Sequence, residues 1–123
     1  MSTKYELIAK DLLDNNYEWL LTNHVNNNFY VPSETVADKY AINIATARAL
    51  CIGILYANNV PVKNSTSLAS QIIINYEKLI VKYVENDFRA GKDFLDVIDA
   101  DLANIRTTFY GVKQVLKLPS KEE

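Results

Sequence analysis

The sequence has little of the chemistry on which enzymes and metal sites depend. It holds one histidine and one cysteine among 123 residues, which leaves no Cys and His cluster with metal-ligand spacing and no partner for an internal disulfide. Its three glycines make no glycine-rich phosphate loop. No apolar run approaches the roughly 20 residues that a membrane span needs. We therefore expect no enzyme, no metal, no cofactor and no membrane partner.

An excess of basic residues is also missing. The net charge of -2 and the pI near 5.4 count against a strongly basic nucleic-acid-binding protein, because Lys and Arg contacts to phosphate supply much of the affinity for DNA. Any DNA binding must come from the local placement of a few cations. The start, MSTKYELIAKDLL, has acidic residues where a secretory signal has a basic patch, so we expect a cytoplasmic protein.

The chain does have enough apolar residues for one folded domain. Hydrophobic residues make up 49% of it and charged residues 23%, which is ordinary for a globular protein. Cys51 lies at helical spacing from Ile54 and Leu55, which predicts a small buried side chain in place of a reactive thiol. The asparagine-rich stretch from Thr22 to Tyr30 predicts a loop, so we expect His24 to be solvated and without a role.

The stretch PSETVADKYAINIATARAL, residues 32–50, has the pattern of a helix-turn-helix. A short helix is expected from Ser33 to Tyr40, with Ser33 as its N-cap and Glu34 adding negative charge at the helix start. Asn43 offers a second N-cap, and Ile44 to Ala57 then predicts a longer helix that carries Arg48.

The flanking segments complete a mainly α fold. Apolar periodicity predicts a helix over residues 5–21, either bent or split in two because Asp14, Asn15 and Asn16 favour turns. The segment VPVKNSTSLA, residues 60–69, alternates weakly and predicts a two-stranded hairpin in the position of a wing. A helix is expected from about Ser67 to Ala90, and Gly91 marks its end. The predicted fold is a winged helix-turn-helix with a small two-stranded wing followed by two C-terminal helices.

The last helix, expected to start near Asp93, carries the most regular pattern in the chain. Apolar residues recur along it at the a and d positions of a heptad repeat and form an apolar seam. Such a seam packs equally well on another helix of the same chain or on a second copy. Acidic residues crowd the start of this helix and basic residues its end, so two antiparallel copies would bring opposite charges together. This pattern motivates a predicted homodimer. Its heptad a and d positions are Leu95, Ile98, Leu102, Ile105, Phe109, Val112 and Leu116.

The runs LLTNHVNNNFYVPSE (residues 20–34) and ADKYAINIATARAL (residues 37–50) resemble the GntR-type winged helix-turn-helix regulators, especially their short YtrA-like members. The resemblance implies a homodimeric transcriptional repressor with a DNA-binding domain at residues 1–67 and a two-helix dimerisation tail at residues 68–123. It also implies that Ser33 binds a backbone phosphate and that Arg48 lies at or in the major groove.

Three departures from the family pattern bear on that assignment. The segment between Pro-Ser-Glu and the turn is one residue short, which shifts the faces of the helix by about 100°. Ile44 stands where the family often has an arginine, and the expected wing offers only Lys63 as a cation.

The function predicted from these patterns is a DNA-binding transcription regulator that reads double-stranded DNA with helix 44–57. A different class of function stays open, in which the fold is a protein-interaction module that has lost DNA binding. The sequence names no small-molecule effector. The residues expected to contact DNA are Ser33, Lys39, Asn43, Ala45, Thr46, Arg48 and Lys63.

Overall fold

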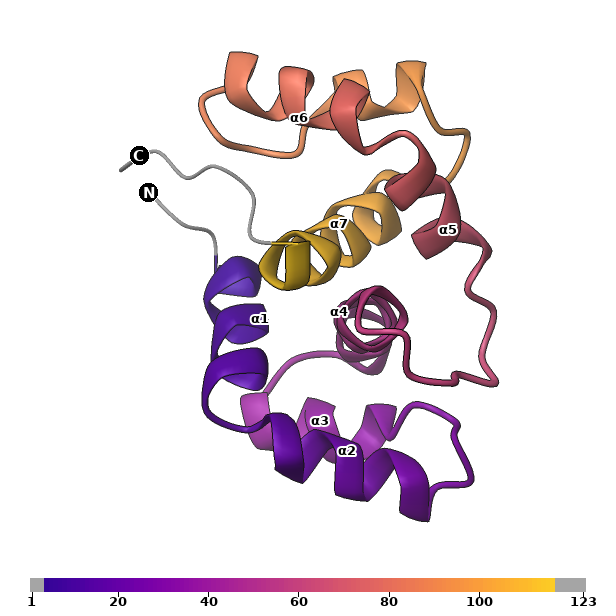
Figure 1. Cartoon of the computed structure of the whole chain (residues 1–123). Coiled ribbons are helices and arrows are strands. Elements are labelled where there is room, and N and C mark those ends of the chain that lie inside the picture. Colours follow the sequence, from indigo (N-terminus) through magenta and orange to yellow (C-terminus); the bar gives the residue numbers. More distant parts are fainter. Residues whose placement is uncertain (1–3, 117–123) are drawn as a thin grey trace.

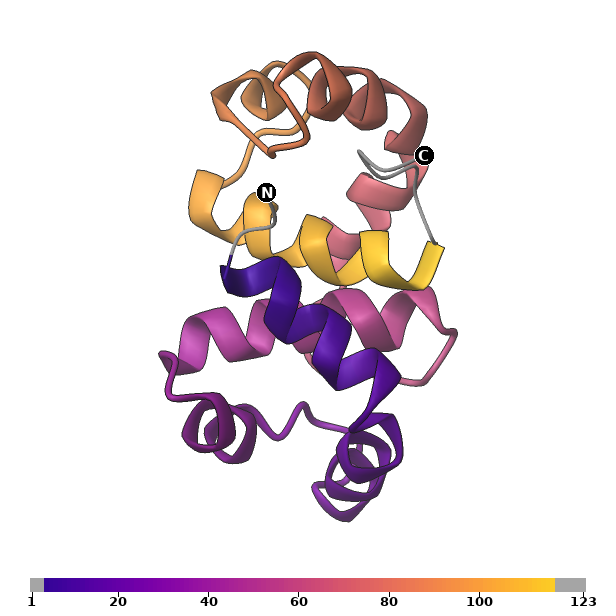
Figure 2. The same cartoon turned by 90° about the vertical axis from the view of Figure 1, so that its left-hand side faces the viewer.

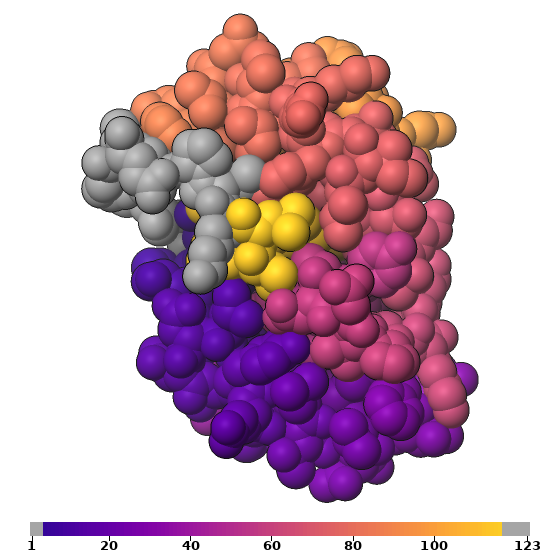
Figure 3. All heavy atoms as spheres, in the orientation of Figure 1, coloured from indigo at the N-terminus to yellow at the C-terminus, as the bar shows by residue number. Residues whose placement is uncertain are grey.

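The computed structural model describes residues 4–116, and within that range every regular element is helical. Helices α4 and α7 run side by side through the middle of the molecule, with α1 lying across them (Figures 1 and 2). Helices α2 and α3 lie at one end and α5 and α6 at the other (Figures 1 and 3). The elements are α1 (Lys4–Asp14), α2 (Tyr17–Asn26), α3 (Ser33–Tyr40), α4 (Ile44–Ala57), α5 (Ser67–Ile74), α6 (Tyr76–Glu85), the 3-10 helix η1 (Lys92–Asp96) and α7 (Leu102–Leu116).

The contact between α4 and α7 is the most extensive in the fold, and two glycines make it possible. A Cβ atom on Gly53 would overlap the Thr108 carbonyl oxygen and lie 3.0 Å from the Val112 amide nitrogen. A Cβ on Gly111 would meet the backbone of α4 in the same way, 3.1 Å from the Ile54 nitrogen. The two backbones therefore touch where they cross, and the apolar side chains on both sides close around that point.

The helix expected over residues 5–21 is two helices, because the Asn15-Asn16 pair interrupts it. The Asp11 carboxylate accepts hydrogen bonds from the side chains of Asn15 at 2.7 Å and Asn16 at 2.9 Å, and from the Tyr40 hydroxyl at 2.7 Å. Bonds of this kind compete with helix continuation. The same carboxylate therefore turns the chain between α1 and α2 and ties that turn to α3.

The expected wing is wrong, because residues 58–66 form neither strand nor hairpin. Their polar groups form hydrogen bonds with the preceding helices and with the loop at residues 27–31, and not with one another. The Pro61 carbonyl accepts from His24 Nε2 at 2.8 Å, and the Lys63 amide donates to the Phe29 carbonyl at 2.8 Å. The segment runs irregularly over α2, and the described residues hold no winged helix.

His24 explains part of the difference between the expected wing and the irregular segment at residues 58–66. Helix α2 extends to Asn26, through the first part of the stretch expected to be a loop, and places His24 in the core with no exposed surface. Its ring lies edge-on to Phe29 at 5.7 Å between centroids, and its hydrogen bond to Pro61 anchors the segment that follows α4. The prediction of a solvated histidine is therefore wrong, and His24 is a structural residue.

The C-terminal part also departs from the two long helices expected. Asn75 separates α5 from α6, and α6 ends at Glu85, where Asp87 and Phe88 adopt left-handed backbone conformations. The last helix begins at Leu102, because Asp101 accepts the Asn104 amide hydrogen bond at 3.3 Å. Residues 97–101 are irregular, so the predicted start near Asp93 is wrong.

The expected dimerisation seam packs largely inside the chain. Ile98, Ile105, Phe109 and Val112 are buried, and Leu102 is half-buried. Only the ends of the seam are open, with Leu95 in η1 43% exposed and Leu116 41% exposed. The burial of these side chains is explained by packing within one chain, and a dimer through them would require α7 to leave the core.

We predict that Gly53→Ala and Gly111→Ala each destabilise the protein by roughly 1–3 kcal/mol, because the added methyl group meets backbone atoms that cannot move independently. The gain in helix propensity of about 0.5–1 kcal/mol is too small to offset this overlap. Urea unfolding should show a lower midpoint with an unchanged slope.

Gly91→Ala is the matched control. The Cβ of that variant would meet the end of the Asn86 side chain, which can rotate away, so a smaller loss is expected. Equal stability of Gly53→Ala and the wild type would contradict the close crossing.

We predict that Asp11→Asn lowers stability near pH 7 and that its deficit narrows below about pH 4. The hydrogen bonds from Asn15 and Tyr40 hold the Asp11 pKa below its ordinary value of 3.8. A lowered folded-state pKa stabilises the protein above the unfolded value, and this stabilisation is lost as the pH falls through the folded-state pKa. Chemical unfolding at several pH values measures the effect.

Asp14→Asn removes a carboxylate in the same helix as a control. Asp14 pairs with Lys10 at 3.0 Å on the surface, with side chains 49% and 63% exposed, so its loss should cost less than about 1 kcal/mol. If the stability of both variants changed with pH in the same way, the hydrogen bonds to the Asp11 carboxylate would make no particular contribution to stability.

Candidate functional site

Helices α3 and α4 form the two helices of a helix-turn-helix, with the bounds expected from the sequence. Their axes are bent by 109° at the intervening residues, which lies within the roughly 90–120° typical of this motif. In the turn, Ala41 adopts a left-handed conformation with φ 53° and ψ 50°. The Ile42 amide then donates to the Ala37 carbonyl at 3.1 Å, which closes the end of α3.

Asn43 caps α4, as predicted. Its backbone is extended, and its side-chain oxygen accepts the Thr46 amide hydrogen bond at 2.7 Å. Since the oxygen is used in the cap, the amide group of the Asn43 side chain carries the remaining donors of this residue. The cap thus fixes the first turn of α4 at the surface of the molecule.

Helix α4 is buried along most of its length and open only near its start. Ile44, Ala45 and Arg48 are exposed and Thr46 is half-buried, whereas Ala47 and Leu50 have no exposed surface. Arg48 makes no ion pair or hydrogen bond with any side chain in the described range. The guanidinium group is therefore available to a ligand.

Ser33 does not cap α3. The cap position belongs to Pro32, and Ser33 is the first helical residue, 7% exposed. Its hydroxyl donates a long hydrogen bond of 3.4 Å to the Val31 carbonyl. The predicted N-cap is therefore wrong, because the chain enters α3 one residue earlier than the Pro-Ser-Glu pattern indicates.

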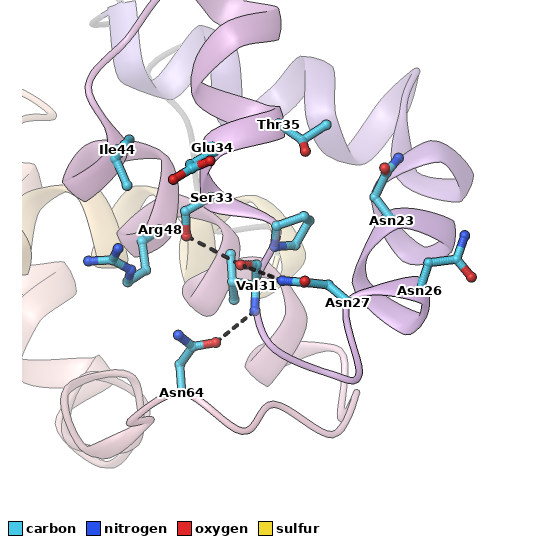
Figure 4. Close-up of a pocket in the computed structure, with 11 residues that line it drawn as sticks. Asn23, Asn26, Asn27, Val31, Ser33, Glu34, Thr35, Ile44, Arg48 and Asn64 are labelled. Atoms are coloured by element: carbon cyan, nitrogen blue, oxygen red, sulfur yellow. Dashed lines mark hydrogen bonds between the residues drawn. The ribbon is translucent and has the colours of Figure 1, made fainter.

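A polar groove of about 640 Å³ lies between α2, α3 and α4 (Figure 4). We call it the asparagine groove. Arg48 and Glu34 are the charged residues in its lining, and no ion pair joins them. Its lining consists of Asn23, Asn26, Asn27, Val31, Pro32, Ser33, Glu34, Thr35, Ile44, Arg48 and Asn64.

The structure brings Ser33 and Arg48 together in this groove and places the other two expected cations elsewhere. Lys39 Nζ lies 4.7 Å from the centroid of the Trp19 ring, and Lys63 Nζ lies 5.7 Å from that of Tyr30. Both are exposed and neither lines the groove. Cation–π contacts of this kind leave the ammonium group in water and open to a further partner.

The asparagines of the groove were missed in the sequence. Asn26 and Asn27 lie three and four residues after Asn23, which is the spacing of one helix face and would have placed them near it had a helix been predicted there. Asn64 comes from the segment expected to be a wing, where its side-chain oxygen accepts the Val31 amide hydrogen bond at 2.7 Å. No local pattern indicates that contact.

No protein-family model, curated protein or solved structure significantly matches this chain. Within residues 4–116, no three His, Cys, Asp or Glu side chains are grouped so that they could hold a metal ion. Cys51 is fully buried, as predicted, and burial raises the pKa of its thiol to about 12. In the same range no single helix is long and apolar enough to cross a membrane, although α3 and α4, with their bend, reach that length together.

We predict that Ala41→Gly stabilises the protein by about 0.5–1 kcal/mol. A left-handed conformation costs a non-glycine residue roughly 1–2 kcal/mol, and glycine removes this cost. The greater freedom of glycine in the unfolded chain opposes folding by about 0.4–1 kcal/mol and so cancels part of the gain in stability. Ala45→Gly makes the same substitution four residues later, at a helical position of α4, and should destabilise the protein by about 1 kcal/mol. Thermal unfolding of both variants tests the opposite signs, and destabilisation by Ala41→Gly would contradict the turn geometry.

Proposed function

We propose that this protein binds double-stranded DNA through the helix-turn-helix of α3 and α4 and acts as a transcription regulator. The observation that carries the proposal is the 109° arrangement of the two helices together with the unpaired Arg48 on the exposed first part of α4. In such motifs the second helix enters the major groove with its N-terminal residues against the base edges.

The exposed residues of α4 suit that role in distinct ways. Arg48 has the planar donor pair that recognises guanine, whereas Asn43 and Thr46 supply neutral hydrogen-bonding groups. Ala45, which is exposed, offers a methyl group to a thymine methyl. Lys39 and Lys63 lie outside the asparagine groove and would contact phosphates, because their ammonium groups stay solvated beside Trp19 and Tyr30.

The charge of this surface limits how strongly it can bind DNA. Arg48, Lys39 and Lys63 are the cations among the residues assigned to the interface, and Glu34 lines the groove together with Arg48. With at most three phosphates neutralised, the slope of log K against log salt should be no steeper than about -3. The proposed complex is therefore weakly salt-dependent, and base contacts and shape carry more of its specificity.

We predict that Arg48→Ala weakens binding to the preferred duplex by about 1–3 kcal/mol, the range of a bidentate base contact. Duplexes enriched from a randomised pool at low salt provide the probe, and fluorescence anisotropy measures the affinity. Since Arg48 is exposed and makes no ion pair or hydrogen bond with a described side chain, the variant should fold normally.

Lys78→Ala is the matched control, because it removes one exposed cation from α6, at the opposite end of the molecule from α3. It should leave the affinity within about twofold of the wild type. Failure to enrich any duplex, or equal binding by the Arg48 and Lys78 variants, would remove the DNA-binding proposal.

A second function is favoured by the asparagine groove itself. Asparagine side chains both donate and accept hydrogen bonds, and so match the peptide backbone of a protein partner better than a row of phosphates. If the protein is an interaction module, Asn26→Leu on the groove wall should disrupt a protein complex and leave the weak affinity for DNA unchanged. Co-purification and anisotropy on the same variant separate the two functions.

A further inference from the structure

A second and smaller cavity lies on the other side of Arg48, between α4, α5 and α7. Its volume is about 250 Å³. Ala49 and Ile52 of α4 and Leu68 of α5 give it an apolar wall, and Ser65, Asn104 and Thr108 give it neutral polar groups. We call it the Arg48 pocket. The full lining is Ala45, Arg48, Ala49, Ile52, Ser65, Leu68, Asn104 and Thr108.

Arg48 is the charged residue of this lining, and no carboxylate accompanies it there. The pocket therefore differs from the asparagine groove, where Glu34 partly balances the guanidinium charge. A cation beside an apolar wall selects a ligand that is anionic at one end and apolar at the other. Arginine is suited to a carboxylate in particular, because its two parallel N–H groups match the two oxygens.

Thr108 adds a hydroxyl group to the wall of the pocket. The residue is 3% exposed, and its hydroxyl makes no side-chain hydrogen bond within the described range. The adjacent Thr107 behaves as helical threonines usually do and donates to the Ala103 carbonyl at 3.0 Å. The Thr108 oxygen is not among the buried polar atoms that lack a partner in the described range, so it still contacts solvent. It can therefore offer a donor and an acceptor to a ligand in the pocket.

We propose that the Arg48 pocket binds a small monocarboxylate with a compact apolar body. The carboxylate would pair with the Arg48 guanidinium, the apolar body would lie against Ala49, Ile52 and Leu68, and the Thr108 hydroxyl would bond to the ligand. The volume sets the size, since an apolar cavity of about 150 Å³ accommodates benzene and drug-sized ligands need about 300 Å³ or more. One aromatic ring or a short branched chain fits this range.

The case for the Arg48 pocket does not rest on the proposed DNA binding. Both sites would nevertheless use the same Arg48 side chain. A carboxylate that holds the guanidinium over the pocket withdraws it from the base edges that α4 would contact. Where both activities exist, the ligand and DNA therefore exclude one another. The site itself is tested without DNA, so its failure is distinct from a failure of the DNA proposal.

Benzoate is the probe, and benzamide is its neutral counterpart of nearly the same shape. Titration of the ¹⁵N-labelled full chain with benzoate should give saturable shifts at the amides of Ala49, Leu68 and Thr108. Benzamide should bind at least tenfold more weakly, because it cannot form the ion pair with Arg48. Equal binding of the two compounds, or no saturable shifts with benzoate, would overturn the proposal.

Three variants localise the effect. Arg48→Gln should weaken benzoate binding at least tenfold, and Ala49→Val should do the same by filling the pocket. Lys78→Gln removes an exposed cation of α6 outside the pocket and should leave benzoate binding unchanged. Should Ala49→Val fold poorly, the exposed Arg48 still provides the decisive variant, and unchanged benzoate affinity in Arg48→Gln would refute the assignment.

Discussion

The direct backbone contact between α4 and α7 is the constraint on which the rest of the structure depends. Because Gly53 and Gly111 lie against the opposite helix, the two axes approach more closely than any side chain would allow. The remaining residues of both helices then fill the space on either side, including Leu50, Ile54 and Phe109, which have no exposed surface. Helices α1, α3 and α5 pack around this pair. The positions of these three helices therefore depend on one crossing, and α2 and α6 pack in turn on α1 and α5.

This crossing also determines how the candidate site is held. The C-terminal part of α4 lies in the core, so its exposed first turn projects from a rigid element and not from a loop. A rigid support restricts the positions that Arg48 can reach, and a side chain held in this way discriminates among ligands better than a mobile one. The asparagine groove and the Arg48 pocket lie on either side of that side chain.

The sequence predicted the local features well and the long-range pairings poorly. The bounds of α3 and α4, the Asn43 cap and the burial of Cys51 follow from spacing and capping chemistry within a few residues. The predicted wing is wrong because the polar groups expected to pair within a hairpin form hydrogen bonds with α2 and with the loop that follows it. The residues next to them in the sequence give no sign of these contacts. Likewise Arg48 was found as an isolated charge, whereas the pocket around it depends on α5 and α7, which lie more than ten residues away in the chain.

The hydrogen bond between His24 and Pro61 joins residues 37 positions apart in the sequence. The chain between them contains α3, the turn and α4, so this hydrogen bond from the buried His24 to the exposed residue Pro61 closes a loop around the helix-turn-helix. A segment closed in this way tends to open and close as one cooperative unit. Its interior contacts also gain from a smaller entropic cost once the loop is closed. The single histidine of this protein thus ties the segment before its central motif to the segment after it.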